Sequence, residues 1–265
     1  MVFSLLLVGV ITGTLSGVLG IGGGLLMVPV LMLSGVGILN ATATSLVGVT
    51  LSAISGSWRN WRVGNLNLTT SFALALGGIP LAQVGAWLGD RLPAAILAFC
   101  FAGLQLLAIY LMGLRRKLAV RSPTQIQPVP IETSPQFKMF GIGSVAGLLS
   151  GLFGVGGGLV MVPLQMLLLE MPIKLAVRTS LGAIVFIAIS ALARHGIQGN
   201  VLWLQGTLLG MGCTIGAQFG TRVLPKIPEK QVNLLFRLLL IAMVGYTIWQ
   251  GVGEMTILRD TETVR

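Results

Sequence analysis

The sequence predicts an all-α polytopic membrane protein made of two inverted-topology repeats. Each repeat has about five helical segments, with a broken helix at a glycine-rich motif. Hydrophobic residues make up 54% of the chain and charged residues only 9%, whereas a soluble domain carries about 25% charged residues. Apolar runs of roughly the 17–25 residues that a membrane span requires follow one another along the chain. The glycine-rich motif occurs once in each half.

The duplicated motif runs from Gly13 to Pro29 and returns, 134 residues later, from Gly147 to Pro163. Three consecutive glycines lie inside each copy: Gly22, Gly23 and Gly24, and then Gly156, Gly157 and Gly158. Consecutive glycines are poor helix formers, and a proline is tolerated in the first turns of a new helix. Each copy therefore predicts a helix, a break and a half-helix within the membrane. The wider spacing of Gly13, Gly17, Gly147 and Gly151 instead predicts close helix packing.

Ten apolar segments follow one another along the chain. We expect them at 2–20, 24–38, 41–58, 68–88 and 94–113, and at 138–154, 158–170, 174–193, 201–221 and 230–251. A basic, proline-rich stretch separates the two sets, and such sequence is extended rather than helical. The predicted parts are an N-terminal transmembrane repeat 1–114, a cytoplasmic linker 115–137, a C-terminal transmembrane repeat 138–252 and a polar tail 253–265.

The repeat continues beyond the glycine motif at a separation of 135 residues. The matching positions are Thr44-Ser45 with Thr179-Ser180, Arg59 with Arg194, and Gln83 with Gln218. Matches kept in register along a whole half indicate an internal duplication. Inverted repeats with broken helices at corresponding positions are typical of secondary transporters, which bind their substrates near the middle of the membrane.

The basic residues indicate how the chain is oriented. Twelve of the 17 lysines and arginines fall in the linker or in turns on the same face, four fall on the other face, and Arg237 lies within a segment. Cytoplasmic loops are enriched in lysine and arginine, so the linker is expected in the cytoplasm and both termini outside. This placement also explains the net charge of +10 without a nucleic-acid partner. The expected partners are the lipid bilayer and a small substrate, and a homo-oligomer is left open.

The breaks predict an anion site. A half-helix that starts near Gly23 or Gly157 presents unpaired N–H groups, which bind anions together with the helix dipole. The six motif glycines would form this site, and the two Thr-Ser pairs could add hydroxyl donors, although hydroxyls also bond their own helix backbone. An unpaired buried amide costs about 1–3 kcal/mol, so we expect Gln83 and Gln218 to bind either the substrate or a neighbouring helix.

Charged residues inside the apolar segments are scarce. Arg178 stands where the first half has Ala43, so it is either a substrate contact or an interfacial anchor. His195 is interpreted as structural. All seven acids lie at segment ends, in the linker or in the tail. We therefore expect no metal site, no cofactor and no enzymatic activity, and neither motif has the Gly-Lys-Ser/Thr ending of a nucleotide-binding loop.

These motifs resemble the TauE/SafE family of sulfite and organosulfonate exporters. The residues that carry the resemblance are Gly20 to Gly24 with Pro29, Gly154 to Gly158 with Pro163, and the two Thr-Ser-Leu triplets. The resemblance implies a bacterial-type inner-membrane protein that exports a small sulfur-containing anion such as sulfite, thiosulfate or a sulfonate. Two alternatives remain at this stage: an anion channel built from the same helix dipoles, and a membrane subunit or scaffold for a soluble partner.

Overall fold

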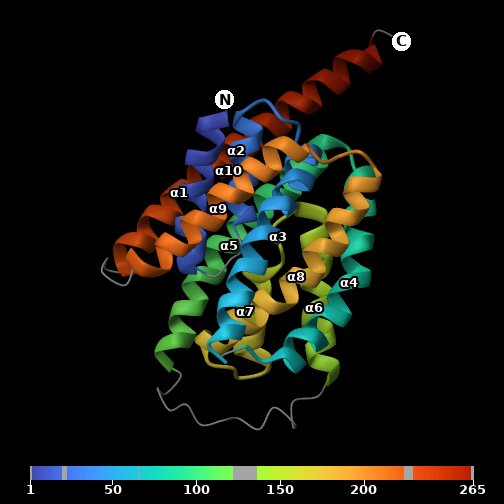
Figure 1. Ribbon diagram of the computed structural model, residues 1–265. Coiled ribbons are helices and arrows are strands. Elements are labelled where there is room, and N and C mark those ends of the chain that lie inside the picture. The colour runs from blue at the N-terminus through green and yellow to red at the C-terminus, as the bar shows by residue number, and fades with distance from the viewer. Residues whose placement is uncertain (1, 20–22, 65, 122–135, 224–228, 264–265) are drawn as a thin grey trace.

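The computed structural model describes residues 2–19, 23–64, 66–121, 136–223 and 229–263, which form ten α-helices. In chain order they are α1 (Val2–Leu19), α2 (Gly24–Leu33), α3 (Ile38–Arg62), α4 (Leu68–Arg91), α5 (Ala94–Arg121), α6 (Gln136–Phe153), α7 (Gly158–Leu168), α8 (Ile173–Ile197), α9 (Trp203–Val223) and α10 (Glu229–Thr263). α1 begins and α10 ends at one end of the bundle, whereas α5 ends and α6 begins at the other (Figure 1).

Each predicted segment corresponds to one of these helices, and the differences lie at the helix ends. α5 continues to Arg121 and so takes in the start of the predicted linker, of which 122–135 lie outside the described residues. α10 continues to Thr263 and takes in most of the predicted polar tail. The prediction ended each segment where the apolar sequence ends. A helix can continue into polar sequence because its backbone hydrogen bonds do not depend on the polarity of its side chains.

Among the described residues, six helical stretches are long and apolar enough to cross a membrane. They are Ile38–Arg62, Leu68–Arg91, Ala94–Leu114, Gln136–Phe153, Ile173–Ile197 and Arg237–Thr256. α2 and α7 are apolar but have only 10 and 11 residues. At about 1.5 Å per residue they span roughly 15–17 Å, about half of the hydrocarbon core of a bilayer. These two helices are therefore half-helices, as the glycine breaks predicted.

α6 and α7 form a hairpin that returns to the end at which α6 begins. The Nζ atom of Lys138, in the first turn of α6, donates to the carbonyl oxygen of Leu168, the last residue of α7, over 3.4 Å. α1 begins and α2 ends at the opposite end of the bundle, so these two helices also form a hairpin (Figure 1). The two hairpins thus enter from opposite ends, and the turn between α6 and α7 is buried in the interior.

Glycines bring the long helices into backbone contact. The most extensive packing is that of α4 against α6 and of α1 against α9. A Cβ atom added at Gly147 of α6 would meet the carbonyl oxygen of Gly78, and one added at Gly151 would meet that of Ala82. Gly13 of α1 packs in the same way on the carbonyl of Cys213. The predicted packing role of these three glycines is confirmed.

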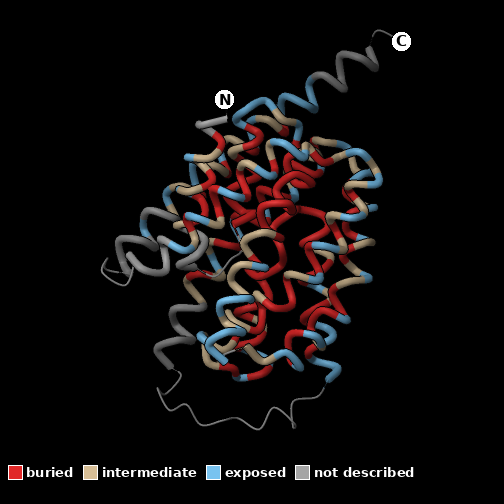
Figure 2. Tube along the Cα trace, in the orientation of Figure 1, coloured by how far each residue is buried: buried red, intermediate tan, exposed pale blue. Residues whose placement is uncertain are grey.

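The buried part of the molecule is centred on the two breaks. Figure 2 shows buried chain through the middle of the bundle and exposed positions on its outward faces. Residues 23–29, 41–50 and 150–163 are buried without exception. Large apolar side chains such as Phe72 and Trp249 are exposed on the outside, which fits helices that face lipid rather than water.

Candidate functional site

The two glycine breaks meet at the centre of the protein. A Cβ atom at Gly24, the first residue of α2, would meet the carbonyl oxygen of Gly154 and would lie 2.8 Å from the Cα atom of Val155. Gly23 precedes α2 with a φ of 82°, and Gly157 precedes α7 with a φ of 75°. Both φ values lie in a region that glycine adopts readily and other residues avoid. The chain therefore turns sharply at Gly23 and at Gly157. The N-termini of α2 and α7 lie close to the contact between Gly24 and Gly154.

The start of α7 presents buried hydrogen-bond donors. No side chain caps the helix at Gly157, and the carbonyl oxygen of Gly157 accepts from the amides of Val160 and Met161. The amides of Gly158 and Leu159 have no acceptor among the described residues, although both residues are buried. A buried, uncapped helix start of this kind attracts anions through its free N–H groups and its dipole.

Ser150 adds a third unpaired donor near this point. Its side chain is fully buried, and its Oγ atom has no hydrogen-bond partner among the described residues. Ser150 lies one helical turn beyond Ala146, on the same face of α6. The Cβ atom of Ala146 lies 2.9 Å from where a Cβ atom of Gly157 would be. This face of α6 is therefore directed toward the break.

The first half of the chain contributes a hydroxyl to the second break. The Oγ atom of Ser45 lies 2.7 Å from the carbonyl oxygen of Thr42 and 2.8 Å from that of Gly154, so its single proton is shared between two acceptors. Ser45 thus ties α3 to the second glycine motif, and a substrate contact by Ser45 stays a prediction. Gly20, which corresponds to Gly154 in the first motif, and Gly22 lie outside the described residues.

Thr179 and Ser180 form a buried polar cluster with Gln165. The Oγ1 atom of Thr179 donates to Oε1 of Gln165 over 2.6 Å, and Nε2 of Gln165 donates to Oγ of Ser180 over 2.7 Å. All three residues are fully buried. Gln165 lies two turns into α7, so this cluster lies beside the half-helix rather than at its N-terminus.

The remaining polar candidates lie at helix interfaces. Oγ1 of Thr44 accepts the amide of Leu202 over 3.0 Å, next to the start of α9. Nε2 of Gln83 donates to the carbonyl oxygen of Ser190 over 2.7 Å and lies 2.9 Å from its hydroxyl. Nε2 of Gln218 donates to Oγ of Ser55 over 3.2 Å.

These bonds satisfy the prediction that each of the two glutamines has a partner. In both cases the observed partner is a neighbouring helix. A role of either glutamine in binding the substrate stays a prediction.

Arg178 lies away from the breaks, whereas His195 contacts the helix that leads into the second break. Arg178 is half-buried in the second turn of α8, at the end of the bundle where α6 begins. His195 is fully buried near the end of α8, and its Nε2 atom lies 2.9 Å from the carbonyl oxygen of Gly151. A carbonyl can only accept, so Nε2 donates and joins α8 to α6. This position fits the structural interpretation of His195.

Sequence reasoning missed Gln165 and Ser150. Gln165 was detectable as an amide inside an apolar half-helix, at a position where the first motif has Leu31. Ser150 lies inside the second motif itself, but a serine within a membrane helix usually bonds its own backbone. Only the packing around Ser150 shows that it does not.

A model of the family described as "Sulfite exporter TauE/SafE" matches residues 5–247. The chain belongs to the TauE/SafE family. Its relatives include two Bacillus subtilis proteins named "Probable membrane transporter protein", YunE and YdhB. YunE is 28% identical over 94% of this chain and 97% of its own length, and YdhB is 29% identical over 87% and 95%. A Xylella fastidiosa protein of the same description is 29% identical over 92% of this chain and 93% of its own. No solved structure matches the chain.

As a TauE/SafE protein, the chain is a multi-pass membrane transporter and not an enzyme. Among the described residues, no group of three or more histidine, cysteine, aspartate or glutamate side chains could hold a metal ion. The names of the relatives state transport without a substrate. The substrate therefore has to be argued from the residues at the breaks.

Proposed function

We propose that the protein is a secondary transporter, and specifically an exporter, of a small sulfur-containing anion such as sulfite, thiosulfate or a sulfonate. The anion would bind between the two repeats, at the N-termini of α2 and α7. The observation that carries this proposal is the buried start of α7, where the amides of Gly158 and Leu159 and the hydroxyl of Ser150 have no acceptor among the described residues. Buried donors without acceptors cost about 1–3 kcal/mol each, and an anion would satisfy all three.

The chemistry of the surroundings favours an anion. From the sequence, all seven acids are expected at segment ends, in the linker or in the tail. No carboxylate is therefore expected to compete with the anion for these donors. A Cβ atom added at Gly156 would meet the aliphatic side chains of Val49 and Ile184, and apolar neighbours of this kind leave the helix dipole poorly screened. The description of the matching family adds sulfite as the leading candidate. An inside-negative potential favours anion exit by about 2.3 kcal/mol per charge per 100 mV.

The inverted-repeat arrangement forms part of this proposal. It is supported by the two hairpins, which enter from opposite ends (Figure 1). It is also supported by two hydrogen-bonded pairs, Gln83 with Ser190 and Gln218 with Ser55. Gln218 lies 135 positions after Gln83, and Ser190 lies 135 positions after Ser55, so the second pair repeats the first with the halves exchanged. We infer that residues 1–114 and 138–252 are repeats related by inversion through the membrane.

The same arrangement supports a cytoplasmic linker and external termini. The basic residues Arg59, Arg62, Lys138, Lys174 and Arg178 belong to helix ends on the side where α5 ends and α6 begins. Asp90, Arg91 and Arg194 belong to the opposite side, where Nδ2 of Asn200 donates to Oδ1 of Asp90 over 2.9 Å. An excess of positive charge marks the cytoplasmic side of a membrane protein.

Burial of the breaks favours a transporter over a channel. The unbroken buried stretches on both sides of the contact between Gly24 and Gly154 leave the donors closed off from both ends of the bundle. The breaks therefore have to separate before an anion can reach the donors. Movement of one hairpin relative to the other would open the site to one side at a time, as alternating access requires.

We further propose that Gly22 to Gly24 and Gly156 to Gly158 contact the anion, and that Ser45 positions the second break through its bond to Gly154. Thr179 and Ser180 would support α7 through Gln165, and Arg178 would attract the anion at the cytoplasmic entrance. Substrate contacts by Thr44, Gln83 and Gln218 remain predictions that single substitutions can test.

The decisive experiment is uptake of radiolabelled sulfite, thiosulfate and sulfoacetate into proteoliposomes, with an amino acid as control and the membrane potential set to either sign. We expect saturable uptake of one sulfur anion. The rate of this uptake should be higher at one sign of the membrane potential than at the other. Flux that rises without saturation would favour a channel. Absence of flux for every anion, with correctly inserted protein, would contradict the proposed substrate class.

A further inference from the structure

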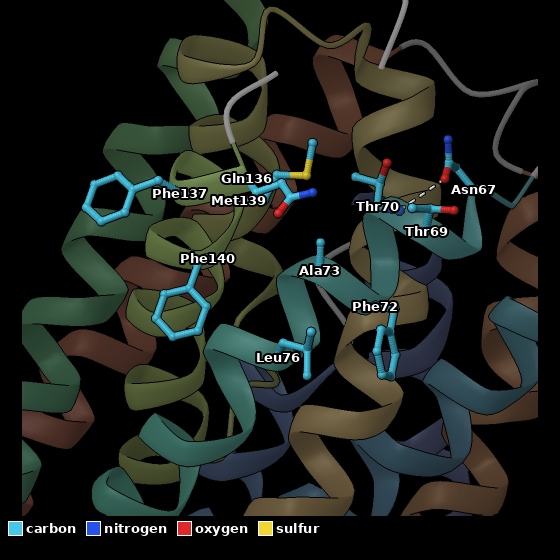
Figure 3. A pocket seen from close by; sticks show the side chains of 10 residues that line it. All are labelled: Asn67, Thr69, Thr70, Phe72, Ala73, Leu76, Gln136, Phe137, Met139 and Phe140. Atoms are coloured by element: carbon cyan, nitrogen blue, oxygen red, sulfur yellow. Dashed lines mark hydrogen bonds between the residues drawn. The ribbon is translucent and has the colours of Figure 1, made fainter. Parts of the chain in front are cut away.

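α4 and α6 separate at one end and leave a groove. Glycine contacts hold the two helices together from Gly77 onward, where an added Cβ atom would meet the carbonyl of Phe140. Before that point they flank an open groove of about 880 Å³, within the usual range of roughly 300–1,000 Å³ for small-molecule sites. It lies at the end of the bundle where α4 and α6 begin (Figures 1 and 3).

One end of the groove is lined by hydrogen-bond donors. Oδ1 of Asn67 caps α4 by accepting the amide of Thr70 over 3.0 Å, and the amides of Leu68 and Thr69 have no acceptor among the described residues. Thr70 lines the cavity and is fully buried, yet its Oγ1 atom has no hydrogen-bond partner in the part of the chain described. A helix start with a free buried hydroxyl is suited to bind a phosphate group.

Apart from Gln136, the rest of the groove is lined by apolar side chains, and it opens outward. Figure 3 shows Gln136 and Phe137 at the start of α6, level with Asn67, Thr69 and Thr70, and Phe72, Leu76 and Phe140 further along the two helices. These four apolar side chains are exposed, Phe137 to 84%. Leu76 lies seven residues after Thr69, about 10 Å further along α4. This distance extends from the headgroup level into the hydrocarbon of one leaflet, which is about 15 Å thick.

We propose that this groove binds a membrane phospholipid, with its phosphate at the start of α4 and one acyl chain against the aromatic wall. A free phosphate would explain the unpaired donors but not the aromatic wall that continues from them, whereas a phospholipid matches both. None of the described residues that line the cavity is acidic, so no carboxylate there would repel a phosphate. This inference does not depend on which anion the protein transports.

The test compares three ligands on the purified full-length protein in detergent. The probe is phosphatidylglycerol, and the controls are a diacylglycerol with the same chains and glycerol phosphate without chains. We expect native mass spectrometry to show phosphatidylglycerol binding at least tenfold tighter than either control. A photoreactive acyl chain should label peptides that contain 68–76 and 137–140.

Two substitutions test the polar end and the apolar part of the groove separately. Thr70→Val removes the hydroxyl but keeps the shape, and should weaken phosphatidylglycerol binding about tenfold, as expected for one hydrogen bond to a charged group. Ala73→Phe fills the floor of the groove and should abolish the acyl-chain labelling. Thr50→Val, at a buried threonine that bonds the carbonyl of Leu46, is the control and should change neither.

Equal binding of diacylglycerol and phosphatidylglycerol would overturn the proposal, because the surface would then be ordinary lipid-facing helix. Equal binding of glycerol phosphate would also overturn it, in favour of a soluble phosphate. Wild-type binding by both variants at the groove, with the protein folded, would show that the lipid lies elsewhere.

Discussion

Substitution of Gly157 by alanine tests the anion site most directly. Gly157 has a φ of 75°, and an added Cβ atom would lie 2.6 Å from the carbonyl oxygen of Ala146. A residue other than glycine in this region of φ costs about 1–2 kcal/mol. Ordinary contacts begin at 3.4 Å, so the start of α7 has to move away from α6 by the difference, about 0.8 Å.

This displacement should impair transport much more than it impairs folding. The free amides of Gly158 and Leu159 follow immediately and would move with the helix start. A misplacement of about 1 Å in a site that positions reacting groups lowers its activity by roughly 100-fold. We therefore expect saturable flux of the sulfur anion to fall by about 10- to 100-fold in Gly157→Ala, with the protein still inserted and monodisperse.

Gly199 provides a matched control. It has a φ of 76° and nothing within 4 Å of an added Cβ atom, so Gly199→Ala introduces the same backbone strain without the contact. Both variants should lose about 1–2 kcal/mol of stability through backbone strain, and Gly157→Ala about 1–3 kcal/mol more through the new contact, measured by thermal unfolding in detergent. Only Gly157→Ala should lose flux in proteoliposomes. Equal flux in the two variants and the wild type would refute the placement of the anion at the start of α7.

Three further substitutions address the polar residues. Gln165→Leu introduces the residue type found at the corresponding position of the first motif, Leu31, and removes two buried hydrogen bonds. It should lower the free energy of unfolding by about 1–3 kcal/mol, measured by thermal unfolding. An unchanged unfolding temperature would show that the cluster is not stabilising. Gln83→Leu removes the bonds to Ser190 and should destabilise the protein by about 1 kcal/mol with the KM for the anion unchanged, whereas a raised KM would make Gln83 a ligand. Arg178→Ala should raise the KM for the anion severalfold at low salt. The increase should be smaller at 1 M salt, where charges are screened beyond about 3 Å. A change in KM that does not depend on salt would argue for a packing role of Arg178 instead.

Much of the fold could be predicted from the pattern of apolar segments. The ten segments follow from their length and their polar turns, because every backbone group in a bilayer has to be satisfied within a helix. The breaks at Gly23 and Gly157 could be predicted for the same reason, since glycine runs disrupt that internal bonding. The helix ends were less predictable. α5 and α10 continue past the apolar sequence because residues such as Arg, Lys, Leu and Ala also favour a helix in a polar environment.

The sequence by itself determined the membrane class, the two breaks and the side chains that could bind an anion. Only the tertiary structure decided which of those side chains lie together. Ser45 reaches the second break because α3 passes beside it, whereas Thr44, the adjacent residue, points to α9. Neighbours on a helix point about 100° apart, so a motif cannot show which of its hydroxyls faces the site. The unpaired Ser150 and the bonds of Gln165 likewise depend on contacts between helices that the order of residues does not encode locally.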